Sequence, residues 1–387
     1  IVEGHRSLGQ DLEADRLRVE EAEIRAAYEL VDNPLVDALR LAARNITRFH
    51  RAQLEREMWS VEVSEGILAG RITRPLERVG CYVPGGRAVY PSTTLMTVIP
   101  ARVAGVREVV AVTPPGKGLS VPPATLVALD IAGCDRVFRM GGPWGVAALA
   151  YGTETVPKVD KIVGPGNRYV TEAKRQVAGD VLIDSPAGPS EVLVVADAEA
   201  DPRLCALELI CQAEHDPDAA VALVTDSAVL LAKVREVLRE EVPRAPRRTI
   251  VEEALARQGA LLLADHHEES LAFAKKYAAE HLALYTRNAR SDMEEAQTAG
   301  TVFLGEAAAV AYGDYITGAN HVLPTGGLAR RFSSLSTLDY LRMYTWQEIT
   351  PAAAAAMSES VQRMAESEGL PGHAEAVRAR RPGAESP

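Results

Sequence analysis

The chain has 387 residues, of which 47% are apolar and 25% are charged, and its formal net charge is -11. At about 150 residues per domain this length predicts two or three domains, and the composition excludes a wholly disordered or collagen-like chain. The acidic balance disfavours nucleic-acid and polybasic membrane partners, and no apolar run reaches the roughly 18–20 residues that a membrane-spanning helix needs.

The first 60 residues have helical character. Apolar residues recur at helical spacing between Glu20 and Phe49, and Asn33-Pro34 marks the start of a second helix. From Val79 onward, short β-branched runs alternate with helical runs, which predicts parallel sheets covered by helices. Nine strands are expected, and they fit two sheets better than one. The expected strands are 108–113, 136–140, 161–163, 181–183, 191–196, 219–225, 260–263, 282–285 and 301–304, and the expected helices between them are 93–104, 122–132, 145–151, 204–213, 227–240 and 268–279.

After residue 305 the pattern predicts no further strand. Residues 333–343 and 352–368 are expected to form helices, and the Arg-, Pro- and Glu-rich stretch 378–387 is expected to fray. A helical tail that follows a complete α/β body packs either on a partner or on its own domain, and the pattern leaves both options open.

The cysteines indicate a reducing compartment. Cys81, Cys134, Cys205 and Cys211 form no CxxC motif and no disulfide framework. This usage is typical of reduced thiols in the cytoplasm. No signal peptide is visible in a sequence that begins at Ile1. We therefore expect a cytoplasmic protein.

Four glycine-containing loops lie between residues 83 and 190. Glycine lets the backbone approach a ligand closely, and helix N-termini favour phosphate groups. Singly, each loop is explained by turn formation, but together they favour a nucleotide or a phosphorylated ligand. None matches the GxGxxG or GxxxxGK[ST] pattern, so the standard dinucleotide fingerprint and the P-loop are absent. The loops are 83–86, 141–144, 164–167 and 187–190.

Two short polar clusters are candidates for chemistry. Gln212 and His215 lie three residues apart at the end of an expected helix and share one face. They can begin a metal site, although two ligands alone equally suit a polar helix end. Glu280 and His281 lie where a helix passes into a strand. A carboxylate beside an imidazole suits general acid–base catalysis, and an exposed surface pair is the alternative.

The C-terminal third adds further polar positions. Residues 313–327 form a polar, glycine-rich stretch with Asp314 and Asn320-His321, which is either a binding loop or an ordinary connection. Glu368 and His373 lie close to the C-terminus, where a lone histidine is usually exposed.

In this order and spacing, these motifs resemble the histidinol dehydrogenase family. The resemblance runs from Tyr82 to His373, and it is specific as a set, whereas no single motif would suffice. The motifs that carry it are Tyr82-Val-Pro-Gly-Gly86, Gly164-Pro-Gly-Asn167, Thr171-Glu-Ala-Lys-Arg-Gln176, Pro186-Ala-Gly-Pro-Ser-Glu191, Gln212-Ala-Glu-His215, Glu280-His281, Gly313-Asp-Tyr315, Asn320-His-Val-Leu-Pro-Thr325 and Leu370-Pro-Gly-His373.

The resemblance implies an α/β fold with two Rossmann-like parallel-sheet domains, one inserted in the other, a helical N-terminal region and a helical C-terminal dimerisation tail. The implied first domain comprises residues 1–81, with the N-terminal helices, and 191–328. The implied inserted domain is 82–190, and the tail is 329–387. The resemblance also implies a homodimer with swapped tails, in which Glu368 and His373 complete the site of the partner.

The activity that the resemblance implies is that of an L-histidinol dehydrogenase. Two successive NAD-dependent oxidations would convert L-histidinol through L-histidinal to L-histidine. One zinc ion per subunit would hold the substrate rather than activate a hydroxide. The implied catalytic residues are Glu280 and His281. The implied zinc ligands are Gln212, His215, Asp314 and His373, the substrate contacts are Ser190, Gln212, His215, His281, Asp314, His321, Glu368 and His373, and the NAD contacts are Tyr82, Asn167 and position 144.

Position 144 departs from the family pattern. Where the family usually has Gly-Gly-Ala-Gln, this chain has Gly141-Gly142-Pro143-Trp144. A tryptophan there would either stack on a ring of the cofactor or block its pocket. The departure motivates an alternative function, a related zinc- and NAD-dependent dehydrogenase of another polar alcohol such as a sulfonated diol. A third hypothesis is a non-catalytic metal- or nucleotide-binding protein that has kept the fold.

Overall fold

The computed structural model describes residues 1–7, 10–85 and 89–380. Gly86 of the Tyr82–Gly86 motif and residues 381–387 of the expected frayed end lie outside the described residues. The chain divides into two compact units, Ile1–Leu54 with Leu76–Tyr340, and Glu55–Pro75 with Leu341–Pro387. Within the described ranges, no helix is both long enough and apolar enough to cross a membrane.

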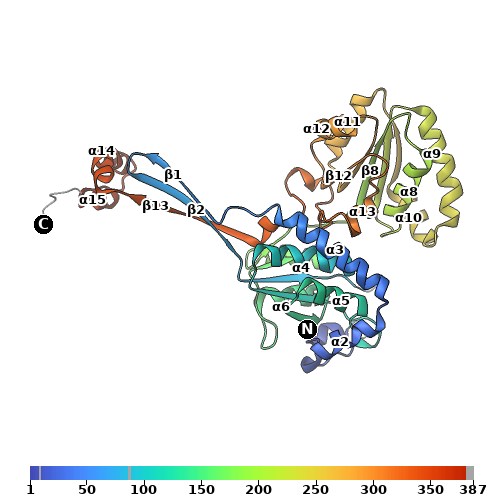
Figure 1. The fold of residues 1–387 in the computed structure, drawn as a ribbon, viewed down its shortest axis with the longest axis horizontal. Helices are drawn as coiled ribbons and strands as arrows, with labels where there is room; N and C mark the ends of the chain where they lie inside the picture. The colour runs from blue at the N-terminus through green and yellow to red at the C-terminus, as the bar shows by residue number, and fades with distance from the viewer. Residues whose placement is uncertain (8–9, 86–88, 381–387) are drawn as a thin grey trace. The chain divides into compact units, whose positions relative to one another are not determined.

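The first unit contains two parallel five-stranded sheets (Figure 1). One sheet has the order β5-β4-β3-β6-β7 and is flanked by helices α4 to α7. Strand β4 is buried along nearly its whole length, because helices cover both faces of the sheet. This burial on both faces explains why its sequence is a continuous Val-rich run instead of an alternating one. The elements are β3 (Arg78–Tyr82), α4 (Pro91–Ala104), β4 (Glu108–Thr113), α5 (Pro123–Ala132), β5 (Arg136–Arg139), α6 (Gly142–Tyr151), β6 (Lys161–Val163), α7 (Arg168–Val177) and β7 (Leu182–Ile183).

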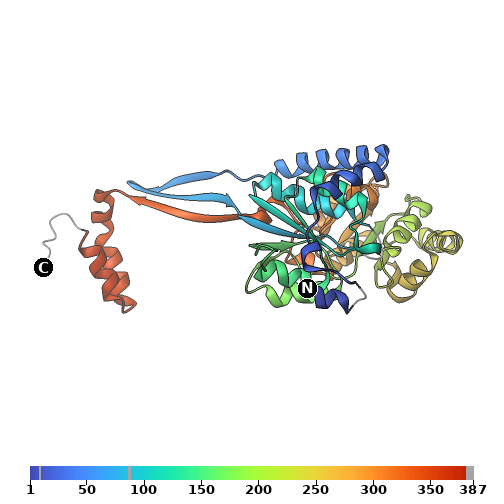
Figure 2. The same cartoon turned by 90° about the horizontal axis from the view of Figure 1, so that it is seen from below.

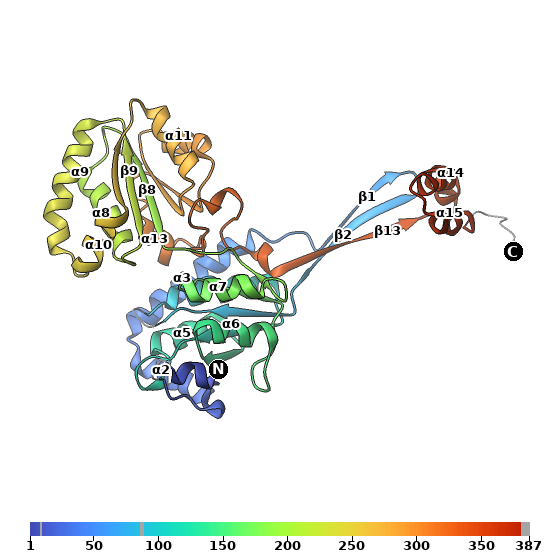
Figure 3. The same ribbon diagram turned by 180° about the vertical axis from the view of Figure 1, so that it is seen from behind.

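The second sheet has the order β10-β9-β8-β11-β12, with α8, α9 and α10 on one face and α11 and α12 on the other (Figure 3). Val192 and Val194 pack toward the first group of helices, whereas Leu193 and Val195 pack toward the second, because successive side chains of a strand alternate between faces. The elements are β8 (Glu191–Ala196), α8 (Pro202–Ala213), β9 (Ala220–Thr225), α9 (Ala228–Glu241), α10 (Arg248–Gln258), β10 (Gly259–Leu263), α11 (His267–Tyr277), β11 (His281–Tyr285), α12 (Ala289–Ala296), β12 (Thr301–Leu304) and the short helix α13 (Val310–Tyr315).

The two sheets confirm the expected α/β class, and all nine expected strands are present. The expected domain boundaries differ from the structure. Residues 78–82 form β3, which pairs with β4 and β6 at the centre of the first sheet, so the expected assignment of 78–81 to the other domain is wrong. Strands β3–β7 precede β8–β12 along the chain, so no strand of one sheet interrupts the other, in contrast to the expected insertion.

The N-terminal helices are α1 (Val2–Arg6), α2 (Glu21–Leu30) and α3 (Asn33–Arg51). The expected break at Asn33-Pro34 is confirmed, because the Asp32 side chain accepts a hydrogen bond from the Leu35 N–H and a proline occupies the first turn of α3. Helix α2 packs on α5, and α3 packs on α4 and α5. These helices therefore cover the sheet of β3–β7, and their expected assignment to the domain of residues 191–328 is wrong.

The second unit contains a three-stranded antiparallel sheet and two helices (Figure 2). Strand β2 (Ile67–Pro75) pairs with β1 (Met58–Ser64) on one side and β13 (Leu341–Ile349) on the other. Helices α14 (Pro351–Ser367) and α15 (Pro371–Arg378) follow β13. The expected helix 333–343 is wrong, and so is the expected absence of strands after residue 305. The cause is the pairing of β13 with β2, a strand that lies far away in the sequence.

Candidate active site

Glu280 and His281 lie at the amino end of β11, a strand between β8 and β12. His281 is opposite Val192 of β8 and Thr301 of β12. Glu280 is 6% exposed and His281 is 4% exposed. The alternative of an exposed surface pair is therefore wrong.

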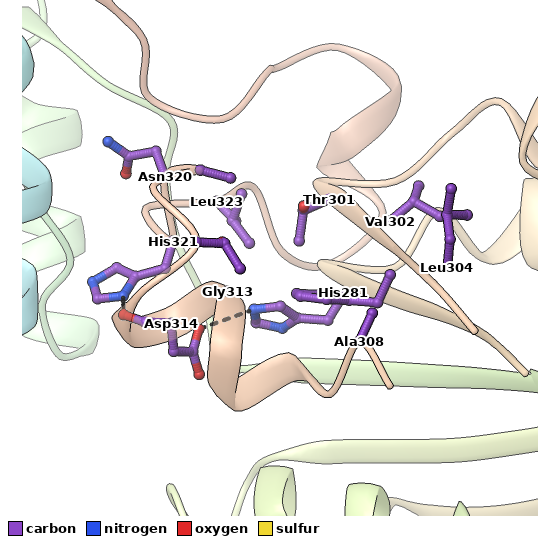
Figure 4. A pocket seen from close by; sticks show the side chains of 13 residues that line it. His281, Thr301, Val302, Leu304, Ala308, Gly313, Asp314, Asn320, His321 and Leu323 are labelled. Carbon is purple, nitrogen blue, oxygen red and sulfur yellow. Dashed lines mark hydrogen bonds and ion pairs between the residues drawn. The ribbon is translucent and has the colours of Figure 1, made fainter. Parts of the chain in front are cut away.

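Hydrogen bonds orient the His281 imidazole. Its Nδ1 donates to the main-chain carbonyl of Glu191 over 2.9 Å, and because a carbonyl only accepts, Nδ1 carries a proton. Nε2 is buried and lies 3.6 Å from Asp314 Oδ1 (Figure 4). Burial favours the neutral imidazole, but the Glu280 and Asp314 carboxylates outweigh it and raise the pKa of His281 to about 9.

Glu280 is held by the first residue of β8. Its Oε2 accepts the Glu191 N–H over 2.7 Å, and the Glu191 carboxylate accepts the Gly326 N–H over 2.8 Å. Burial raises the pKa of Glu280 to about 7, which suits a group that exchanges protons with water near neutrality. Ser190, a predicted substrate contact, directly precedes Glu191 and is half-buried. The sequence pattern places Glu191 in a family motif but does not predict its contacts with Glu280 and His281.

A cavity of about 260 Å³ opens beside His281. Asp314 lies between His281 and His321 in Figure 4, and both histidines also line the cavity. His321 Nδ1 donates to the Asp314 carbonyl over 2.9 Å, and burial lowers the pKa of His321. Apolar residues from β12 line another part of the wall. A small, partly apolar cavity with a few converging polar groups is typical of a site for a small polar molecule.

Three of the predicted zinc ligands lie in the first unit. Gln212 is in the last turn of α8, His215 follows directly, and Asp314 is in α13. Burial lowers the pKa of His215, while the Asp314 carboxylate acts in the opposite direction. Gln212 Oε1 is buried and has no hydrogen-bond partner among the described residues. A neutral imidazole, a carboxylate and an amide oxygen without a partner fit a zinc ion.

The fourth predicted ligand, His373, belongs to the second unit. There His373 and Glu368 are both exposed. Across the described parts of the chain, no group of three His, Cys, Asp or Glu residues is arranged to hold a metal ion. Of the three predicted ligands in the first unit, His215 and Asp314 are of these residue types, whereas Gln212 is not, because it would bind the metal through an amide oxygen. The four-ligand set therefore stays a prediction.

The predicted cofactor contacts lie at the carboxyl edge of the first sheet. Tyr82 ends β3, and its hydroxyl accepts the Gly142 N–H over 2.9 Å. Asn167 caps α7 by accepting hydrogen bonds from the N–H groups of residues 169 and 170. Gly164, at φ +112°, lies so close to Tyr82 that a Cβ would stand 2.2 Å from its carbonyl oxygen. The loops after β3, β5 and β6 thus adjoin at the edge where dinucleotides bind in such sheets.

The Trp144 indole packs against α1. Its ring centroid lies 5.7 Å from that of His5, and a Cβ on Gly4 would lie 2.1 Å from the indole. His5 Nε2 accepts the Gly141 N–H over 3.1 Å. Helix α1 therefore contacts both the tryptophan and the glycine loop before it. Sequence reasoning did not identify His5, because its partner lies far along the chain.

A buried ion pair holds the Gly164–Asn167 loop. Lys174 Nζ donates to the Gly164 carbonyl over 3.0 Å and pairs with the Asp184 carboxylate, which also accepts the Gly164 N–H over 2.6 Å. Both side chains are 5% exposed. Removing one partner of a buried pair leaves an uncompensated charge, whereas removing both charges is far less costly.

We expect Lys174→Met to lower the free energy of unfolding by about 3–5 kcal/mol. Arg175→Met, which breaks the exposed pair with Glu172, is the matched control and is expected to cost less than about 1 kcal/mol. Adding Asp184→Asn to Lys174→Met is expected to recover part of the loss, since the amide still accepts the Gly164 N–H. Urea unfolding of the unsubstituted chain, the two single variants and the double variant measures these differences. Equal losses of unfolding free energy in Lys174→Met and Arg175→Met would contradict a stabilising role of the buried ion pair.

Comparison with known proteins shows the family of the chain. The histidinol dehydrogenase family profile matches residues 4–381. Histidinol dehydrogenase from Methanothermobacter thermautotrophicus is 50% identical over 366 residues, covering 95% of this chain and 86% of the relative. The enzyme from Methanopyrus kandleri is 50% identical over 377 residues, covering 96% and 88%. The crystal structure of histidinol dehydrogenase from Elizabethkingia anophelis has a TM-score of 0.94 at 38% identity, covering 98% of this chain and 87% of that one. The chain belongs to the histidinol dehydrogenase family, a family of NAD-dependent oxidoreductases of histidine biosynthesis.

Proposed function

We propose that this chain oxidises L-histidinol through L-histidinal to L-histidine, with two NAD reduced in turn and with one zinc ion per subunit. Family membership supports the activity. The observation that carries the residue assignment is the buried Glu280–His281 pair, whose imidazole lines one cavity with Asp314 and His321. The cytoplasm is the proposed location, in keeping with four free thiols.

The zinc ligands in this proposal are Gln212, His215, Asp314 and, from a second subunit, His373. When bound, zinc would hold the imidazole and amino nitrogens of the substrate, which are ligands that it accepts readily. Ser190 and His321 would contact the substrate directly. The exposed Glu368 carboxylate of the second subunit would pair with the substrate ammonium.

In the first oxidation, His281 takes the hydroxyl proton at Nε2. NAD, when bound, would supply the hydride acceptor for the alcohol carbon and later for the hydrated aldehyde. The hydrogen bond from Nδ1 to the Glu191 carbonyl keeps the imidazole in place while Nε2 accepts the proton. Without a bound ligand, the Glu280 and Asp314 carboxylates stabilise the protonated imidazole of His281. A cation held by Asp314 would lessen this stabilisation and leave the imidazole able to act as a base.

In the second oxidation, the aldehyde must first take up water. Glu280 removes a proton from that water, a role that suits a buried carboxylate whose pKa is about 7. After the proton from the first oxidation has passed from His281 Nε2 to solvent, Nε2 takes the hydroxyl proton of the hydrated aldehyde as the second hydride leaves. The Glu191 main chain holds both groups, its N–H bonded to Glu280 and its carbonyl to His281, so they keep their places through both oxidations.

The proposal includes a homodimer whose tails complete the sites. The second unit exposes large apolar side chains of β1 and α14, among them Met58 at 60%, Val63 at 65% and Met364 at 64%. Large apolar side chains that are exposed in number favour contact with a protein partner. A second copy of the chain is the proposed partner, because Glu368 and His373 on the same unit are exposed and unused within it.

The first test is NADH absorbance when zinc-loaded protein is mixed with L-histidinol and NAD. We expect two NADH per L-histidinol, loss of activity on removal of the metal by a chelator, and recovery on addition of zinc. The alternative of another polar alcohol is motivated by Trp144. If L-histidinol is inert with zinc confirmed in the protein, while a sulfonated diol produces NADH, the substrate assignment is wrong.

A further inference from the structure

Glu208 is a buried carboxylate for which the proposed mechanism has no role. It lies on α8 and is 5% exposed. Gln212 is four residues further along the helix, so the two side chains share one face, and His215 follows the C-cap residue Glu214. The Glu208 side chain therefore points to the same side of α8 as Gln212, one of the proposed zinc ligands.

Both carboxylate oxygens of Glu208 accept hydrogen bonds. Oε1 accepts the Val310 N–H over 3.0 Å, and Oε2 accepts the Tyr285 hydroxyl. Val310 is 2% exposed and is the first residue of α13, the helix that carries Asp314. The residue before it is Ala309, which has no side chain that could cap the helix. The Glu208 carboxylate therefore supplies the hydrogen bond that the start of α13 needs.

We propose that Glu208 is a positioning residue for the metal site. Its carboxylate ties the start of α13, and with it Asp314, to the helix that carries Gln212 and His215. The inference rests on the proposed zinc site. Groups that hold metal ligands in place change metal affinity by about 10–100-fold when they are removed, so the role is measurable without turnover.

The test measures the zinc affinity of the purified full chain by competition with a chromogenic chelator. Glu208→Leu keeps much of the side-chain volume but leaves the Val310 N–H and the Tyr285 hydroxyl unpaired, and we expect zinc affinity to fall about 10–100-fold. Glu208→Gln retains an acceptor for the Val310 N–H. Its loss of zinc affinity is expected to be less than about one third of the fold-change seen for Glu208→Leu.

Val310→Pro probes the same contact from the other side. Proline at the first position of a helix is well tolerated, and Ala309 already has the extended backbone that precedes proline. The variant removes the N–H that Glu208 accepts and keeps the Glu208 carboxylate. We expect zinc affinity to fall at least about tenfold. If Glu208→Leu fails to fold, this variant tests whether the contact between Glu208 and Val310 positions the zinc ligands.

Two controls separate positioning from charge and from general stability. Glu214→Gln removes a partly exposed carboxylate that acts electrostatically on His215 but, among the described residues, accepts no hydrogen bond from the start of α13. Tyr285→Phe removes the second Glu208 contact and leaves the Val310 contact intact. Both are expected to keep zinc affinity within about threefold of the unsubstituted chain.

Three outcomes would overturn the inference. Folded Glu208→Leu or Val310→Pro protein with unchanged zinc affinity would show that the contact does not position the ligands. A loss of zinc affinity in Glu214→Gln as large as that in Glu208→Leu would show that charge alone is responsible. An unsubstituted chain that binds no zinc would refute the proposed zinc site itself, and that result is distinct because it precedes any comparison of variants.

Discussion

His281→Asn is expected to abolish both oxidations while zinc and L-histidinol still bind. Asparagine retains a polar side chain close to the Glu191 carbonyl but cannot take a proton from an alcohol. A general base contributes about 10²–10⁴-fold to the rate, and a loss of kcat in that range is expected for each step. The measurement is NADH formation with L-histidinol and, separately, with L-histidinal.

The control for this variant is His266→Asn. His266 is exposed and caps α11 by accepting the Glu269 N–H, and asparagine is a good residue for that position. Its kcat is expected to match that of the unsubstituted chain. Zinc content and L-histidinol binding, measured by metal analysis and calorimetry, must stay normal in His281→Asn. Near-normal turnover of this variant would remove His281 as the base.

Mixed dimers of Gln212→Ala and His373→Ala chains are expected to regain activity that neither parent has. If His373 completes the partner's site, a mixed dimer has one site with both substitutions and one site with neither. Dimers purified through two different affinity tags would then have about half of the activity of the unsubstituted dimer. The measurement is NADH formation by the doubly tagged fraction.

Each parent dimer is the control for the mixed dimer, and both are expected to lack zinc-dependent activity. A mixed dimer of Gln212→Ala with the unsubstituted chain calibrates the activity of one intact site. If the doubly substituted mixed dimer is as inactive as its parents, His373 does not complete a partner's site and the swapped tail is wrong.

The two proposed halves of the active site meet at α4. The helix begins after the cofactor-side loop that follows β3, and its Met96 carbonyl accepts a hydrogen bond from Asn320 Nδ2 over 2.7 Å. Thr93 Oγ1 in the first turn lies 3.2 Å from His321 Nε2. One helix thus contacts the segment that contains His321 and follows β3, the strand that ends at Tyr82.

The amino-acid sequence by itself determined the α/β class, all nine expected strands and the break between α2 and α3. These features depend on short-range effects, such as β-branched runs buried between helices and the cap that Asp32 provides. The family motifs determined the candidate residues, since they preserve residue types at fixed spacings.

Only the tertiary structure decided the antiparallel sheet of β1, β2 and β13, the place of β3, and the contacts of Glu191, Glu208 and Trp144. Each of these depends on a partner that lies far away along the chain, as β2 does for β13 and Val310 for Glu208. A strand such as β13 has mostly exposed side chains, so its sequence contains no alternating apolar pattern to reveal it. The physical reason is that the spacing of apolar residues predicts which side chains of one segment are buried. The pairing between distant segments is determined only when the whole chain folds.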